Sequence, residues 1–259
     1  MPDSLDMTGK VAIVTGGTRG VGRGIAERLL AAGARVVVCG RTIPEEPVWQ
    51  ASFIAADVRE PEQIDRVVAH TVAECGRIDV LVNNAGGAPH VLVADSSPNY
   101  SAKVIALNLI APLHFARAAN AVMQEQDTGG SIVSIGSISG FRPSPGTAAY
   151  GAAKAGLSNL TRSLAVEWAP RVRVNCVVGG PIVTEQAALH FGDEEGIRAV
   201  GATIPMGRMA TPADIAEAVL WLSSPSASYV TGTDLFVHGG GERPAWMGAS
   251  TAEGLSGPR

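Results

Sequence analysis

The sequence predicts a doubly wound α/β fold, in which helices on both faces cover a mostly parallel sheet of seven strands. Short runs rich in Val, Ile and Ala alternate along the chain with longer segments of helical periodicity. Hydrophobic residues make up 46% of the 259 residues and charged residues only 17%, which is typical of strands that are covered on both sides. A glycine-rich turn joins the first predicted strand to the first predicted helix.

The elements follow in order along the chain. The predicted strands are Lys10–Thr15, Arg35–Cys39, Ser52–Ala56, Asp79–Asn83, Ser131–Gly136, Val172–Val178 and Asp234–Val237. The predicted helices are Val21–Ala32, Pro61–Cys75, Ser101–Gln126, Ala148–Trp168 and Pro212–Ser223. Pro61 and Pro212 each follow a residue that can cap a helix, so both mark helix starts. Only about a dozen residues separate Cys39 from Ser52, so we expect a loop or a single turn there.

Composition restricts the class of protein. We expect a single domain over residues 1–259, with a core from about residue 7 to 240 and a flexible tail over 241–259. The net charge of -4 and the lack of a basic run argue against a nucleic-acid partner. The first ten residues do not resemble a signal peptide, and we find no apolar stretch approaching the ~18 residues that span a bilayer. Cys39, Cys75 and Cys176 fit no metal or disulfide spacing, so we expect a cytoplasmic protein without a metal site or membrane contact.

The segment after the first strand has the glycine spacing of a phosphate-binding turn. It reads Thr15-Gly16-Gly17-Thr18-Arg19-Gly20-Val21-Gly22 and runs into a predicted helix. Glycines let the backbone approach a pyrophosphate, and the helix N-terminus offers free N–H groups and partial positive charge. A merely structural turn is the alternative, but the position between the first strand and the first helix favours a dinucleotide site.

The end of the second strand indicates which dinucleotide binds. An NAD site usually carries an Asp or Glu about 20 residues after the glycines, but here Arg41 follows the strand and no carboxylate is present. Arg41 and Arg19 can approach a ribose 2′-phosphate from two sides. Two charge-assisted hydrogen bonds would favour NADP over NAD by on the order of 10²–10⁴. The alternative is that Arg41 is an ordinary solvated arginine.

Polar residues also follow the third and fourth strands. Asp57 can bond the adenine amino group while Val58 covers the ring, or Asp57 can instead cap the helix that begins at Pro61. The fourth strand runs into Asn83-Asn84-Ala85-Gly86-Gly87, where the asparagines either border the site or simply hold a turn together.

A chemical centre is indicated by Tyr150-Gly-Ala-Ala-Lys154, because i, i+4 spacing on a helix puts phenol and ammonium on one face. A positive charge about 5 Å away lowers the pKa of a phenol by roughly two units, and an oxidised nicotinamide would add further positive charge, so we expect the phenol to titrate close to neutral pH. Ser137, at the end of the fifth strand, can hydrogen-bond a substrate oxygen. Asn108 interrupts an apolar helix and can hold a water linked to Lys154. Taken singly, each of these residues could equally be structural.

These motifs together resemble the short-chain dehydrogenase/reductase family in its shorter, single-domain, Rossmann-like form, over about residues 7–240. The resemblance implies a tetrad of Asn108, Ser137, Tyr150 and Lys154. In it Tyr150 is the general acid, Lys154 lowers its pKa and binds the nicotinamide ribose, Ser137 orients the substrate, and Asn108 holds a relay water. The expected cofactor-binding residues are Gly16, Thr18, Arg19, Gly20, Val21, Gly22, Arg41, Asp57, Val58, Asn84, Ala85, Gly86, Tyr150, Lys154, Gly180, Ile182 and Thr184.

The resemblance further implies NADP(H) as cofactor, with NAD(H) less favoured, and a homotetramer or homodimer. Two positions depart from the family pattern: Gly179 stands where proline is usual, and His238 where an acidic residue is usual. A lid is expected over Glu185–Ile204, closing on a small carbonyl or alcohol such as a 3-oxoacyl thioester, a cyclic ketone or a steroid. The alternatives are a cofactor sensor with little turnover and an NAD-linked alcohol dehydrogenase.

Overall fold

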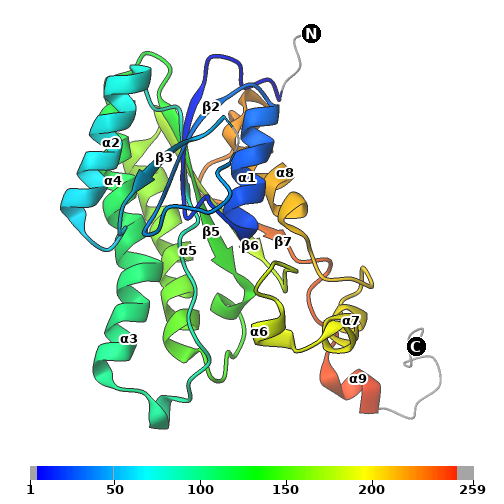
Figure 1. Ribbon diagram of the computed structural model, residues 1–259. Helices are drawn as coiled ribbons and strands as arrows, with labels where there is room; N and C mark the ends of the chain where they lie inside the picture. Colours follow the sequence, from blue (N-terminus) through cyan, green and yellow to red (C-terminus); the bar gives the residue numbers. More distant parts are fainter. Residues whose placement is uncertain (1–4, 49, 250–259) are drawn as a thin grey trace.

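The computed structural model describes residues 5–48 and 50–249, and its seven strands form one sheet in the order β3-β2-β1-β4-β5-β6-β7 (Figure 1). The strands are β1 (Val11–Thr15), β2 (Arg35–Gly40), β3 (Ser52–Ala55), β4 (Val80–Asn83), β5 (Gly130–Ser137), β6 (Val172–Gly179) and β7 (Asp234–Val237). Every neighbouring pair is parallel. Strand order reverses at β1, which lies between β2 and β4, so the predicted doubly wound sheet is confirmed and its switch point lies there.

Helices cover both faces of this sheet (Figure 1). The helices α1 (Gly20–Ala31) and α8 (Pro212–Ser223) lie on one face, and α2 (Pro61–Cys75), α4 (Ala111–Glu125) and α5 (Ala148–Trp168) lie on the other. Successive residues of β1 point to opposite faces, so Val14 packs with α1 and α8 while Ile13 packs with α2 and α4. The shorter helices α3 (Pro98–Ile105), α6 (Ala188–Phe191), α7 (Glu194–Thr203) and α9 (Ala245–Ala249) lie beyond the carboxyl ends of the strands.

Capping differs between the two helices that begin with proline. At α8 the Thr211 hydroxyl accepts from the N–H of Asp214, and the Asp214 carboxylate accepts from the N–H of Thr211 at 2.7 Å, a complete capping box. At α2 the residue before Pro61 is Glu60, whose side chain makes no capping bond. Both helices therefore begin at the predicted proline, although a side-chain cap forms only before Pro212.

The predicted helix Ser101–Gln126 starts earlier and is not uniform. It begins at Pro98, because the Ser97 hydroxyl accepts a 3.1 Å hydrogen bond from the N–H of Tyr100. Between α3 and α4 the backbone widens into one π-helical turn over Ala106–Ile110. Pro112 follows at once and has no N–H to continue the regular ladder, which accounts for a change of hydrogen-bonding pattern there.

The helical run Pro98–Glu125 is long and apolar enough, by length and composition alone, to cross a membrane, contrary to the expectation from sequence. Such helices are also common in protein cores, and 39% of its most apolar window is buried within the protein. Phe115, Ala119 and Met123 pack into the core layer beneath the sheet. Packing against the sheet therefore accounts for the buried part of this run.

Two connections bear on the expectations above. Among the described residues between β2 and β3 there is no helix, as the short spacing predicted, and Val48 packs into the core instead. Within the tail, Ala245–Ala249 form the short helix α9, which was not predicted. Residues 250–259, the rest of the predicted flexible tail, lie outside the described part.

Candidate active site

A cavity of about 780 Å³ opens at the carboxyl ends of the central strands, where parallel sheets of this class bind ligands. It brings together nearly all the predicted site residues. Its lining includes Gly16, Thr18, Arg19, Gly20, Val21, Gly22, Arg41, Asp57, Val58, Asn84, Ala85, Gly86, Ser137, Tyr150, Lys154, Gly180, Ile182 and Thr184. Asn108 alone among the predicted residues does not line the cavity.

The glycine-rich turn has the backbone geometry that its sequence predicted. Gly16 and Gly20 have φ of +62° and +52°, in the left-handed region that favours glycine. A methyl group on Gly22 would lie 2.2 Å from the carbonyl oxygen of Gly16, so only glycine lets α1 pack this closely on the turn. Arg19 precedes α1 without a side-chain cap, and the first N–H group of the helix, that of Gly20, donates to the Glu185 carboxylate, so this helix start already attracts an anionic group.

Thr15 supports this turn, a role that the sequence analysis missed. Its buried hydroxyl accepts hydrogen bonds from the N–H groups of Asn84 and Ala85, both at 2.9 Å. In return, the Asn84 side-chain amide donates to the carbonyl oxygens of Thr15 at 2.8 Å and Gly16 at 3.2 Å. These bonds tie the end of β1 to the end of β4, so Asn84 both holds a turn and borders the cavity.

Asp57, which follows β3 and lines the cavity, does not cap α2. Its carboxylate instead accepts from the Nε of Arg59 and from the Arg59 backbone N–H, both at 3.0 Å. This hydrogen-bonded guanidinium, with a smaller contribution from the charge of Arg41, lowers the pKa of Asp57. Arg59 also lines the cavity and was not singled out from the sequence, although it lies only two residues after Asp57.

Arg41 and Arg19 are both exposed at the cavity rim. In the described part of the chain, neither makes a salt bridge. Two cations that have no carboxylate partner are therefore available to an anionic ligand at this end.

The phenol and the ammonium group lie together, as their spacing predicted. The Nζ of Lys154 is 5.5 Å from the ring centre of Tyr150 and donates a 2.7 Å hydrogen bond to the carbonyl oxygen of Ile135. Burial lowers the pKa of Lys154 to about 8. Burial also raises the pKa of Tyr150, and a hydrogen bond with Ser137 acts in the opposite direction.

In the protein alone, Lys154 does not bring the phenol close to neutral pH, and the expectation from sequence also counted the positive charge of an oxidised nicotinamide. The estimate from Coulomb's law left out desolvation, which disfavours both the tyrosinate and the ammonium form in this interior. Further positive charge at the site would be needed to favour the tyrosinate.

Asn108 is fully buried and is bonded to the backbone that borders the cavity. Its Oδ1 accepts from the N–H of Gly87 at 2.9 Å, and its amide donates to the carbonyl oxygens of Gly87 at 3.0 Å and Val104 at 2.9 Å. The π-helical turn places it there. All its hydrogen-bonding groups thus have protein partners, and it clamps the segment after β4.

The two departures from the family pattern lie near the cavity. The side chain of His238 packs against Gly180, where an added methyl group would lie 2.9 Å from the His238 Cβ. His238 also contacts Phe236, which stacks edge-on with Phe141. The histidine therefore belongs to an aromatic cluster next to the turn that Gly179 opens.

The predicted lid region contains two short helices, α6 and α7. Asp193 caps α7 by accepting from the N–H of Gly196 at 3.0 Å, as expected for a solvated helix start. Glu185, beside Thr184, accepts a 3.4 Å hydrogen bond from the N–H of Gly20 at the start of α1. This segment thus reaches the phosphate-binding turn.

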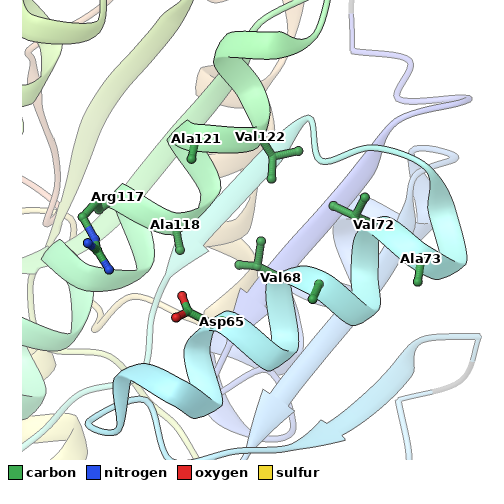
Figure 2. A pocket seen from close by; sticks show the side chains of 9 residues that line it. Asp65, Val68, Val72, Ala73, Arg117, Ala118, Ala121 and Val122 are labelled. Atoms are coloured by element: carbon green, nitrogen blue, oxygen red, sulfur yellow. The ribbon is translucent and has the colours of Figure 1, made fainter.

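A second hollow of about 630 Å³ lies between α2 and α4, away from the chemical groups. Figure 2 shows Val68 and Val72 of α2 facing Ala118 and Val122 of α4 across it. The lining is mostly Ala and Val, and it contains none of the predicted site residues.

Comparison with known proteins decides the family. Residues 16–242 match the family model described as enoyl-(acyl carrier protein) reductase. The chain belongs to the short-chain dehydrogenase/reductase family. The 3β-hydroxysteroid dehydrogenase 1 of Eggerthella lenta is 36% identical over 250 residues, which cover 91% of this chain and 94% of that protein. The 3-oxoacyl-(acyl-carrier-protein) reductase of Salmonella typhimurium is 36% identical over 245 residues, covering 91% and 98%.

A solved structure agrees with these relatives. A protein of Beutenbergia cavernae, described as an NAD(P)-dependent gluconate 5-dehydrogenase with bound NADP, superposes with a TM-score of 0.85 at 36% identity. The match covers 92% of this chain and 98% of that one. This chain is therefore an oxidoreductase of a family that acts on alcohols and ketones and binds a nicotinamide cofactor.

Proposed function

We propose that the protein is an NADP(H)-dependent oxidoreductase that interconverts a ketone and a secondary alcohol. The observation that carries this proposal is the shared cavity, which has the glycine-rich turn at one end and Ser137, Tyr150 and Lys154 at the other. The residues present fit a dinucleotide. Gly16, Gly20 and Gly22 leave room for a pyrophosphate beside the start of α1, and the exposed Arg41 and Arg19 suit a ribose 2′-phosphate.

The proposed roles follow from this arrangement. When bound, the nicotinamide supplies or accepts the hydride. In reduction, Ser137 hydrogen-bonds the substrate oxygen, and Tyr150 gives its phenolic proton to that oxygen as the carbonyl carbon becomes an alcohol. Burial raises the pKa of Tyr150, so the phenol still carries its proton at neutral pH before the reaction. Lys154 places positive charge beside the tyrosinate that results.

The substrate we propose is a medium-sized, fairly apolar carbonyl compound. The 3β-hydroxysteroid dehydrogenase and the 3-oxoacyl reductase among the relatives support a steroid ketone or a 3-oxoacyl thioester. The exposed Leu189 on α6 and Met206 beyond α7 offer apolar surface in and beside the predicted lid, which suits such a compound.

We also propose a homodimer or homotetramer. Val166 of α5 is 83% exposed, and the hollow between α2 and α4 presents further apolar surface, which a second copy would cover. Light scattering at micromolar concentration tests this, and a monomer would contradict it.

The deciding experiment follows NADPH and NADH oxidation with a panel of steroid ketones, 3-oxoacyl thioesters and cyclic ketones. Wild type is compared with Tyr150→Phe, which keeps the ring but removes the proton donor. Turnover with NADPH that falls at least about 10³-fold in Tyr150→Phe supports the proposal. Tight NADPH binding without turnover on the whole panel would instead favour a cofactor sensor, and a preference for NADH would favour an NAD-linked dehydrogenase.

A further inference from the structure

Arg59 holds Asp57 at the edge of the cavity by a two-pronged contact. One guanidinium nitrogen, Nε, lies 3.0 Å from Oδ1 of the carboxylate, and the Nη2 nitrogen bonds the other oxygen at 2.5 Å. The two side chains are 31% and 20% exposed, so the pair is partly withdrawn from water. Such a fork-to-carboxylate contact neutralises the carboxylate and fixes its orientation together.

Several charged side chains lie around Asp57, so neutralising its carboxylate changes how strongly this end of the cavity attracts an anion. Arg41, Asp57 and Arg59 line the same wall, and Glu45 and Glu46 lie on the loop after β2. Glu46 is 3.9 Å from Arg23, which is itself bonded to Glu27 at 2.8 Å. Asp57 is near enough to Arg41 for the charge of Arg41 to help lower the pKa of Asp57. An ionised Asp57 without Arg59 would therefore weaken the attraction that Arg41 exerts on an anion.

We propose that Arg59 is a specificity-determining residue, which cancels the charge of Asp57 so that a cofactor with a ribose 2′-phosphate is accepted beside Arg41. The inference rests on the proposed use of NADP(H). The remaining lone pairs of Asp57 stay available for the adenine amino group, a contact that NADP and NAD share. Arg59 therefore acts on the difference between the two cofactors, through the 2′-phosphate alone.

The size of the effect follows from Coulomb's law. If a released carboxylate stood about 8 Å from a dianionic phosphate, at an effective dielectric constant of about 60, it would weaken binding about tenfold. NADH lacks the phosphate, so its affinity should change less than about threefold.

The experiment measures the Kd of NADPH and NADH separately, by nicotinamide fluorescence titration of the full chain at low salt. The variants are Arg59→Gln, Asp57→Asn and the double variant. Arg35→Gln is the control, because Arg35 is exposed at the opposite end of β2. We expect Arg59→Gln to weaken NADPH about tenfold, and the double variant, in which both charges are removed, to bind NADPH within about threefold of wild type. Melting curves show that each variant is folded.

Two results would overturn the inference: an unchanged NADPH-to-NADH ratio in Arg59→Gln, or a double variant that keeps the whole defect. A failure of the proposed cofactor is distinguishable from both, because wild type would then bind NADH as tightly as NADPH before any substitution is made.

Discussion

Lys154 is only 4% exposed, and its ammonium group donates a 2.7 Å hydrogen bond to the carbonyl oxygen of Ile135. A lysine with one backbone acceptor and little water loses more hydration than it recovers, so its pKa falls to about 8. This displacement corresponds to about 3 kcal/mol of stability given up at neutral pH to keep a cation in the site.

We therefore predict that Lys154→Met stabilises the protein by about 1–3 kcal/mol at pH 7 while removing activity. Between pH 8 and 10.5 the unfolded chain still binds the lysine proton and the native protein does not, so wild-type stability rises with pH relative to the variant. Urea unfolding of both proteins at pH 7 and 9.5 measures this. A stability difference that fails to narrow at pH 9.5 would contradict the assignment.

Gly22 is the tightest point of the phosphate-binding turn. An added methyl group would meet the Gly16 carbonyl oxygen at 2.2 Å and the Asn84 amide at 2.4 Å. We predict that Gly22→Ala costs more than about 3 kcal/mol of stability and abolishes dinucleotide binding, because backbone must move. Gly40→Ala is the matched control. Its methyl group would have ordinary contacts at 3.8 Å or more, and it should change stability by less than about 1 kcal/mol.

Thr15 offers a test of the link between β1 and β4. Thr15→Val keeps the shape but removes the acceptor of the Asn84 and Ala85 N–H groups. We expect a loss of about 1–3 kcal/mol in the free energy of unfolding, and Thr15→Ser should recover most of it. If valine and serine behave alike in chemical denaturation, the hydroxyl has no such role.

A substitution at Asn108 tests whether this residue is a structural clamp or a proton-relay residue. Because it bonds the backbone of Gly87 and Val104, we predict that Asn108→Ala lowers the unfolding free energy by about 2–4 kcal/mol and lowers kcat together with it. Thermal melting and steady-state kinetics on the same preparation separate the two readings. An unchanged melting temperature with a large fall in kcat would favour the relay role.

Local sequence carried most of the fold and much of the site. Runs of apolar residues placed the strands, and β1, β2, β4, β5 and β6 are buried along most of their length, as expected where helices cover both faces. The edge strands β3 and β7 are only partly buried. The glycines at 16, 20 and 22 and the i, i+4 pair of Tyr150 and Lys154 are local patterns whose geometry follows from the chain itself. The parallel order then follows from helices of crossover length.

What the sequence could not decide depends mostly on partners distant in the chain. Thr15 receives the N–H groups of Asn84 and Ala85, which follow β4, and Asn108 bonds Gly87. Asp57 binds Arg59, two residues away, instead of capping α2, and sequence alone could not choose between these two local partners. The effect of burial on the pKa of Tyr150 could not be predicted, because a charge at fixed spacing is visible in the sequence, whereas burial is not. Residue types and periodicity thus determined the helices, the strands and the chemical groups available. Only tertiary packing decided which of these groups are buried and which hydrogen-bond partners they have, because both depend on the segments that pack around each group and exclude water from it.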